Sequence, residues 1–169
     1  MEQVVLVNEQ DHVMGTMEKM EAHQKGVLHR AISVFIYNAQ DDLMLQQRAA
    51  HKYHSPLLWT NTCCSHPFEN ETYQEAAERR LQEEMGFECP LEEKFHFIYK
   101  ADVGNGLLEH ELDHVFVGRF DNIPNLNPDE VAQYEWKNHE TILKELEDTP
   151  EKYTEWFKII FKEYLQRLR

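Results

Sequence analysis

Glycine, proline and cysteine are all scarce in this chain of 169 residues, which contains 6 Gly, 6 Pro and 3 Cys. So few glycines and prolines exclude a collagen-like or low-complexity chain, and the 41% of hydrophobic residues is typical of a folded globule. The sequence also lacks an apolar run long enough to cross a membrane and a Pro/Gly/Ser-rich linker. We therefore expect a single domain over residues 1–169.

Basic residues are few relative to acidic ones. The chain has 17 Lys and Arg against 31 Asp and Glu, which gives a formal net charge of -14. Such a charge disfavours nucleic acid and anionic membrane surfaces as partners. An anionic small molecule would need clustered basic side chains, or a divalent cation held by carboxylates, to offset the surplus acid.

The cysteines are Cys63, Cys64 and Cys89, and their odd number and adjacency do not suit a disulfide framework. The N-terminus has no basic segment followed by an apolar stretch, so it does not read as a signal peptide. These features predict a cytoplasmic protein in a reducing compartment. We expect a monomer, with a weak homodimer as the alternative.

Alternating or β-branched apolar residues predict strands over 4–7, 28–37, 43–48, 95–103, 112–120 and 131–136. Segments 28–37 and 43–48 are expected to form a hairpin. A helix is predicted over 71–85 and ends before Gly86, and a second one covers the apolar stripe from Tyr153 to Leu168, capped and started by Thr149 and Pro150. The expected fold class is α+β, a mixed β-sheet sandwich flanked by helices.

Several of the 10 histidines lie at spacings that suit a metal ion. His23 and His29 are close in sequence, and on a strand Glu109 and Glu111 share one face while His110 points away. Imidazoles and carboxylates together favour Zn²⁺, Mn²⁺ or Mg²⁺. The alternative is that these are surface histidines beside an acidic strand edge.

Residues 65–87 resemble the Nudix box, the pattern Gly-x5-Glu-x7-Arg-Glu-U-x-Glu-Glu-x-Gly-U, in which U is an apolar residue. Two positions depart from it: Ser65 stands in place of the leading Gly, and Arg80 in place of a metal-binding Glu. A hydrolase that cleaves diphosphates needs its full set of carboxylates. The resemblance therefore implies a Nudix-like fold that binds a diphosphate without cleaving it.

The remaining motifs resemble one branch of this superfamily, the type 1 isopentenyl-diphosphate isomerases. The resemblance covers nearly the whole chain and is carried by Gly15-Thr16-Met17-Glu18-Lys19, His23, His29, Arg48-Ala49-Ala50-His51-Lys52, Trp59-Thr60-Asn61-Thr62-Cys63-Cys64-Ser65-His66-Pro67, Arg79-Arg80, Tyr99, Glu109-His110-Glu111 and Trp156.

This resemblance implies that Cys64 and Glu111 are catalytic, with Tyr99 as a hydrogen-bond partner of Glu111. It further implies that one divalent ion is bound by His23, His29, His66, Glu109 and Glu111. Glu84 is expected to help hold a Mg²⁺ that neutralises the substrate diphosphate. The residues expected to contact the substrate are Lys19, Arg48, Lys52, Arg80 and Trp156.

Moving the double bond of isopentenyl diphosphate to give dimethylallyl diphosphate requires a proton to arrive at one carbon and another to leave two carbons away. A strong, well-aimed acid in a dry site is needed. We expect Glu111 to donate and Cys64, as a thiolate whose pKa nearby cations lower, to accept; the reverse assignment stays open. Trp156 would face the developing positive charge.

Each role has a plainer alternative. Trp156 and Tyr99 suit simple core packing, and the basic residues suit solvent-facing positions. Cys63 and Cys89 are expected to be buried small hydrophobes, because only one of two adjacent strand residues faces a site. The rival functions are a Nudix diphosphate hydrolase, which Arg80 disfavours, and a non-enzymatic metal-binding module.

Overall fold

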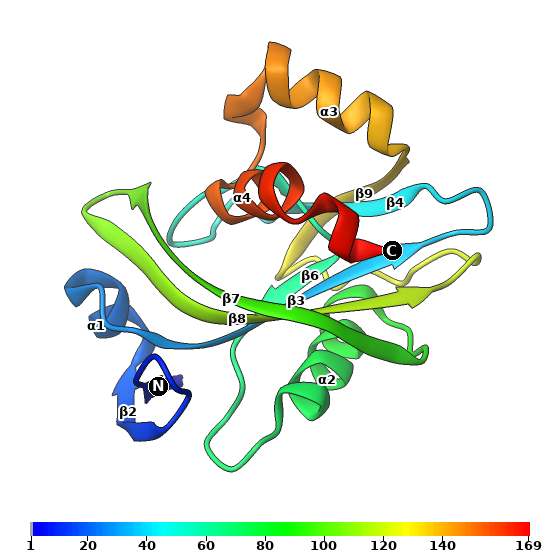
Figure 1. The fold of residues 1–169 in the computed structure, drawn as a ribbon. Coiled ribbons are helices and arrows are strands. Elements are labelled where there is room, and N and C mark those ends of the chain that lie inside the picture. Colours follow the sequence, from blue (N-terminus) through cyan, green and yellow to red (C-terminus); the bar gives the residue numbers. More distant parts are fainter. Residues whose placement is uncertain (1) are drawn as a thin grey trace.

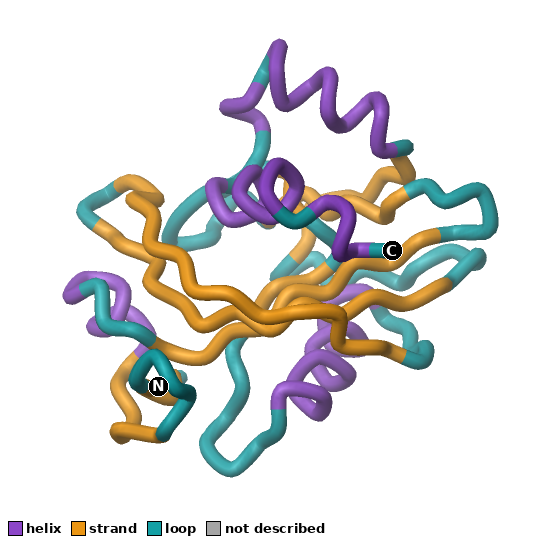
Figure 2. The backbone as a smooth tube through the Cα atoms, viewed as in Figure 1, coloured by secondary structure: helices purple, strands orange, loops and turns teal. Residues whose placement is uncertain are grey.

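The computed structural model describes residues 2–169 as a nine-stranded mixed sheet with helices on both faces (Figures 1 and 2). The strands are β1 (Gln3–Val7), β2 (Val13–Glu18), β3 (His29–Tyr37), β4 (Leu43–Arg48), β5 (Trp59–Thr60), β6 (Cys63–Ser65), β7 (Leu91–Gly104), β8 (Leu107–Arg119) and β9 (Val131–Lys137). The α-helices are α1 (Lys19–Lys25), α2 (Tyr73–Met85), α3 (His139–Asp148) and α4 (Glu155–Glu163), and two 3₁₀ turns are η1 (Pro150–Lys152) and η2 (Leu165–Leu168).

Strand β3 lies at the centre of the sheet. It pairs in parallel with β8 along its whole length, from His29 opposite Glu111 to Tyr37 opposite Arg119. On its other side it pairs antiparallel with β6, where Ser33 lies opposite Cys64. A strand covered on both faces needs apolar residues on both, which explains the nearly unbroken apolar run in β3.

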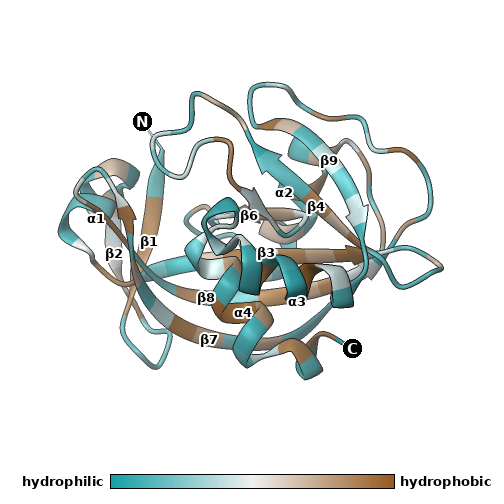
Figure 3. Ribbon diagram, turned by 90° about the horizontal axis from the view of Figure 1, so that it is seen from above, coloured by the Kyte–Doolittle hydropathy of each residue, from teal (hydrophilic) through white to brown (hydrophobic). Residues whose placement is uncertain are grey.

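Two apolar cores lie on opposite faces of this sheet. Helix α2 covers one face, where Leu81 and Met85 pack against Ile32. Helix α4 covers the other, where Phe157 and Phe161 belong to the larger cluster. Figure 1 shows α2 and α4 on opposite sides of β3, and in Figure 3 strand β7 alternates between apolar and polar residues.

The predicted strands and α2 are confirmed, with ends that shift by a few residues. Helix α2 begins after the cap Thr72 rather than at residue 71, and it ends at Gly86, whose φ of 73° is left-handed. A Cβ at Gly86 would collide with the backbone of Asn125, so only glycine suits this position. The fold class, α+β with helices flanking a mixed sheet, is confirmed.

The predicted hairpin of β3 and β4 exists only at its turn. Tyr37 pairs with Leu43, after which β4 leaves β3 and pairs with β9 over Leu43–Arg48. The C-terminal part of β4 also pairs with β5. Long-range pairing therefore outweighs the local hairpin signal. Beyond the turn, the Thr62 hydroxyl bridges the two strands, since it accepts from the Ile36 N–H and donates to the Met44 carbonyl.

The C-terminal helix is shorter than predicted. Thr149 and Pro150 start only the turn η1, and Tyr153 then adopts an extended backbone and bridges to Trp59. Because the N–H of Thr154 donates to the carbonyl of Trp59, helix α4 begins after Thr154, whose side chain caps it. Our prediction of one continuous helix from Pro150 to Leu168 is therefore wrong at both ends.

Sequence analysis missed β2, α1, α3 and the short strand β5, and it placed Cys63 and Cys64 on a strand without giving the bounds of β6. Helix α1 is capped by the Glu18 side chain, an uncommon choice at that position. Helix α3 carried a usable signal, since Asn138 caps it and Ile142 and Leu146 are four residues apart on its buried side. Within residues 2–169, no helix combines the length and apolar character needed to cross a membrane.

Candidate active site

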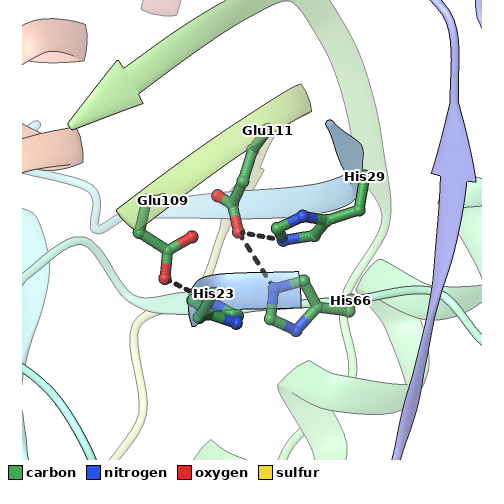
Figure 4. Close-up of side chains that lie close together, drawn as sticks. All are labelled: His23, His29, His66, Glu109 and Glu111. Carbon is green, nitrogen blue, oxygen red and sulfur yellow. Dashed lines mark hydrogen bonds and ion pairs between the residues drawn. The ribbon is translucent and has the colours of Figure 1, made fainter. Parts of the chain in front are cut away.

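Five predicted metal ligands come together from four separate parts of the fold. Their donor atoms all lie within 4.8 Å of one another, and their side chains point toward a common centre (Figure 4). Strand β8 contributes Glu109 and Glu111 from one face, while His110 points away and contacts the carbonyl of Gly26. Helix α1, the start of β3 and the segment after β6 supply His23, His29 and His66.

The backbone holds two of these imidazoles in a fixed orientation. The Nδ1–H of His23 donates to the carbonyl of Lys19 at 2.6 Å, and that of His29 donates to the carbonyl of Val27 at 2.8 Å. Both rings therefore direct Nε2 at the carboxylates, with 2.8 Å from His23 to Glu109 and 3.3 Å from His29 to Glu111. Such bonds at the far nitrogen are typical of metal-binding histidines.

Burial and hydrogen bonds shift the pKa values of several residues in this cluster. Burial disfavours charged imidazoles, yet hydrogen bonds to Glu109 and Glu111 raise the pKa values of His23 and His29. At His66 burial is the largest cause and lowers the pKa, even though its Nε2 lies 2.9 Å from Glu111 Oε2. Burial of Glu111 is outweighed by its histidine partners, which hold its pKa well below the usual range.

The donor set fits a divalent ion. Oxygen Oε2 of Glu109 is buried and has no hydrogen-bond partner among the described residues, which is costly unless a cation satisfies it. Three imidazole nitrogens and two carboxylates suit a borderline ion such as Zn²⁺ or Mn²⁺, and also Mg²⁺. The cluster is consistent with the metal site predicted from the sequence.

Glu111 also faces the pocket beside the cluster, where the buried Tyr99 hydroxyl donates to its Oε1. Burial raises the pKa of Tyr99 well above its usual range, so the phenol keeps the proton it donates. The predicted contact between Tyr99 and Glu111 is present. Tyr99 lines the pocket and also packs against Phe97, so it belongs both to the apolar core and to the site.

Cys64 lines the same pocket and comes from the other side of β3. Its thiol donates to Asn61 Oδ1 at 3.2 Å and its sulfur accepts from Trp156 Nε1 at 3.1 Å. Cys63 faces the opposite core and is fully buried, as predicted, whereas Cys89 is only partly buried, contrary to our expectation. Cys64 and His66, two residues apart, both line the pocket.

The expectation that nearby cations lower the pKa of Cys64 is not met. Burial raises it to about 12, the Asp113 charge acts in the same direction, and the Trp156 N–H and the Arg48 charge oppose this shift without cancelling it. This shift favours the thiol over the thiolate.

All four predicted basic residues line the pocket, together with Trp156. Lys19 pairs with Glu2 at 2.8 Å, and Lys52 pairs with Glu130. The guanidinium of Arg48 lies 5.2 Å over the Trp156 ring. These bases therefore converge on one cavity rather than facing solvent independently.

Arg80 and Glu84 form a pair on α2. Arg80 Nη2 donates to Glu84 Oε2 at 2.6 Å, and Gln46 Nε2 donates to Glu84 Oε1 at 3.0 Å. Burial opposes the charge of Arg80, but Glu84 and neighbouring acids raise its pKa, so it stays a cation. Glu84 lies outside the His/Glu cluster of the described residues, and its Mg²⁺ role stays a prediction.

Sequence analysis missed two buried residues of this site. His54 Nε2 lies 2.7 Å from Glu109 Oε1, and no motif marked it. Asp113 shares the face of Glu109 and Glu111 and accepts from Ser33 Oγ at 2.7 Å. Alternation along β8 was a signal for Asp113, because residues two apart on a strand share a face. Burial raises the pKa of Asp113 well above its usual range, whereas it lowers that of His54.

The Nudix domain model matches residues 27–157. A protein of Pectobacterium atrosepticum named isopentenyl-diphosphate Delta-isomerase is 52% identical over 159 residues, covering 94% of this chain and 89% of that protein. The chain belongs to the Nudix-fold isopentenyl-diphosphate Delta-isomerases. The Aromatoleum aromaticum isopentenyl-diphosphate Delta-isomerase 2 is 51% identical over 155 residues, covering 92% of this chain and 82% of that protein.

Membership of the isopentenyl-diphosphate Delta-isomerases agrees with the fold. The crystal structure of DR0079 from Deinococcus radiodurans superposes with a TM-score of 0.80 at 21% identity, over 95% of this chain and 98% of that one, which shows a shared fold. In this isomerase-family chain, Ser65 lies in β6 and has no left-handed φ. Serine therefore replaces the Nudix-box glycine without backbone strain.

Proposed function

We propose that this chain interconverts isopentenyl diphosphate and dimethylallyl diphosphate by a 1,3-allylic proton shift. The observation that carries the proposal is the placement of the Cys64 thiol and the Glu111 carboxyl, from strands on either side of β3, in one pocket lined by four basic side chains. Relatives at 50% identity or more bear the name of this activity.

Of Cys64 and Glu111, one would act as the general acid and the other as the general base. One group delivers a proton to the terminal methylene carbon, and the other removes a proton two carbons away, which moves the double bond without net redox change. Tyr99 would orient the Glu111 carboxyl. Both directions of transfer are compatible with this pairing, and isotope labelling of each variant distinguishes them.

Binding energy from the diphosphate would place the alkene between these groups. Lys19, Arg48, Lys52 and Arg80 supply the positive charge, and a Mg²⁺ associated with Glu84 would add to it. Trp156 would present its ring to the carbocation that develops, a contact worth roughly 2 kcal/mol when desolvated. Because Trp156 also donates to Cys64, it would hold the sulfur in place.

A divalent ion, Mn²⁺, Mg²⁺ or Zn²⁺, would be held by His23, His29, His66, Glu109 and Glu111, the residues that form the buried cluster. It would supply positive charge that fixes the Glu111 carboxyl in place. We further propose a cytoplasmic monomer built as one domain over residues 1–169, with a weak homodimer as the alternative.

The test is NMR of isopentenyl diphosphate incubated with the protein and Mg²⁺. We expect the methyl signals of dimethylallyl diphosphate to appear, and solvent deuterium to enter the substrate. Cys64→Ala and Glu111→Gln should each abolish both, whereas Cys89→Ala, outside the pocket, should leave them unchanged. Circular dichroism checks that each variant is folded.

Near-normal turnover by either site variant would refute the role of that residue. Release of phosphate from the C5 substrate or from nucleoside diphosphates would instead favour the Nudix hydrolase alternative. Retention of metal without turnover of either class would favour a metal-binding module.

A further inference from the structure

A fourth imidazole contacts the metal cluster from outside. His54 lies between β4 and β5 and is only 2% exposed. Its Nε2 is 2.7 Å from Glu109 Oε1, the same oxygen that contacts His23 Nε2 at 2.8 Å. The donor atom of His54 does not belong to the group of five that surround a common centre. It therefore sits behind Glu109 rather than among the ligands.

Contacts with neighbouring residues fix the position of His54. Arg48 Nη2 donates to the His54 carbonyl at 3.1 Å, and Ser55, with a left-handed φ of 50°, turns the chain immediately afterwards. The ring lies 5.7 Å from that of Trp156 at an interplanar angle of 85°. His54 thus links the cluster to the residue that donates to the Cys64 sulfur.

The hydrogen bonds of the ring are mutually consistent. Glu109 has only acceptor oxygens, so a neutral His54 must carry its proton on Nε2 to bond with it. Nδ1 is then free to accept from the Ser55 hydroxyl, which lies 3.1 Å away. With one oxygen of Glu109 held in this way, the other, Oε2, is the buried oxygen that has no partner among residues 2–169.

We propose that His54 is a positioning residue of the metal site, which holds Glu109 Oε1 and so turns Oε2 toward the ion. This inference rests on the metal cluster within the proposed function and does not depend on which reaction the pocket catalyses. Removing such a partner from a metal ligand typically weakens metal binding by about 10- to 100-fold.

The experiment measures the affinity of the whole protein for Zn²⁺ and Mn²⁺ by competition with a chromophoric chelator. His54→Ala should weaken binding by about 10- to 100-fold and still bind one ion. His54→Gln, whose amide donates from a similar position, should recover most of the affinity. His51→Ala is the matched control, because His51 is an exposed histidine three residues earlier in the same loop and should bind as wild type does.

X-ray absorption of the Zn²⁺ form provides the second measurement. The number of imidazoles around Zn²⁺ should be the same in wild type and His54→Ala, whereas His66→Ala should lose one.

Wild-type affinity in His54→Ala would overturn the proposal, as would a wild type that binds neither ion. Loss of one imidazole in His54→Ala would also overturn it, since His54 would then be a ligand. If His54→Ala does not fold, the same comparisons are made with His54→Gln and His54→Asn, and wild-type affinity in the asparagine variant would overturn the proposal.

Discussion

At the scale of single residues, identical side chains have different roles because of the face on which they lie. Cys63 and Cys64 are adjacent on β6, but Cys63 packs in the core beneath α2 and Cys64 lines the pocket. Glu109 and Glu111 likewise face the metal cluster, and His110 between them does not. The alternation of strand side chains is sufficient to separate these roles once the strands are assigned.

His139, which lies outside the pocket, should affect the stability of the fold at acidic pH. His139 accepts from Arg169 at Nδ1 and contacts the Tyr37 hydroxyl through Nε2 at 2.8 Å, so the fold favours its neutral form. Burial, followed by the Arg169 charge, lowers its pKa from 6.5 to about 4. Between about pH 4 and pH 6.5, the unfolded chain therefore binds up to one proton more than the folded chain. The resulting stability is complete above pH 6.5 and is lost as the pH falls toward about 4.

We expect His139→Gln, which cannot titrate, to reduce this loss. Between pH 7 and 5 the free energy of unfolding should fall by on the order of 1 kcal/mol more in wild type than in the variant, with solvent screening limiting the effect. Urea unfolding at the two pH values measures it. An identical pH dependence of the two proteins would show that His139 does not titrate on unfolding.

At the scale of elements, the start of α4 is set by a contact across the fold. Thr154 is fully buried, and its hydroxyl donates to Thr60 Oγ1 at 3.0 Å and accepts from the Phe157 N–H. This cap follows the bridge between Tyr153 and Trp59, which stops the helix from beginning earlier. The same contact brings the next turn, with Trp156, to the pocket.

Thr154→Ala should therefore destabilise the protein by about 1 to 3 kcal/mol, because it removes a helix cap and a buried hydrogen bond. Thr154→Ser keeps the hydroxyl and should lose less. Thr141→Ala is the control, since Thr141 is an exposed helical residue of α3 and should change stability by less than about 0.5 kcal/mol. Chemical unfolding of the three variants measures the difference, and equal losses at Thr154 and Thr141 would contradict the capping role.

At the scale of the whole molecule, the sheet has a protected centre and an exposed edge. β3 is paired on both sides and covered on both faces, whereas β2 ends the sheet and exposes Val13 and Met14 by 57% and 68%. Because global unfolding is needed to open the centre, the amides of β3 should exchange with solvent most slowly and those of β2 fast. Hydrogen exchange followed by mass spectrometry measures both, and similar rates in β2 and β3 would contradict this ranking.

Much of the fold and part of the site could be predicted from local patterns. The apolar runs of β3 and β8 and the glycine after α2 mark elements without reference to the rest of the chain. Short elements such as α1 and β5 could not be recognised in this way, because their stability comes from packing and pairing with distant strands rather than from propensity. His54 carried no signal, since its role depends on meeting a strand that begins more than fifty residues later.

The sequence by itself determined the residue types at the site, the alternation that turns Glu109 and Glu111 to one face, the surplus of acid, and the motifs shared with the isomerase family. The tertiary structure decided which distant groups meet: Trp156 on the Cys64 sulfur, His54 on Glu109, and β8 in parallel beside β3. It also decided that the pKa of Cys64 is raised, because burial and the neighbouring Asp113 outweigh the Trp156 N–H and the Arg48 charge. Burial and charge depend on what surrounds a side chain in space, and only the packed sheet supplies those neighbours.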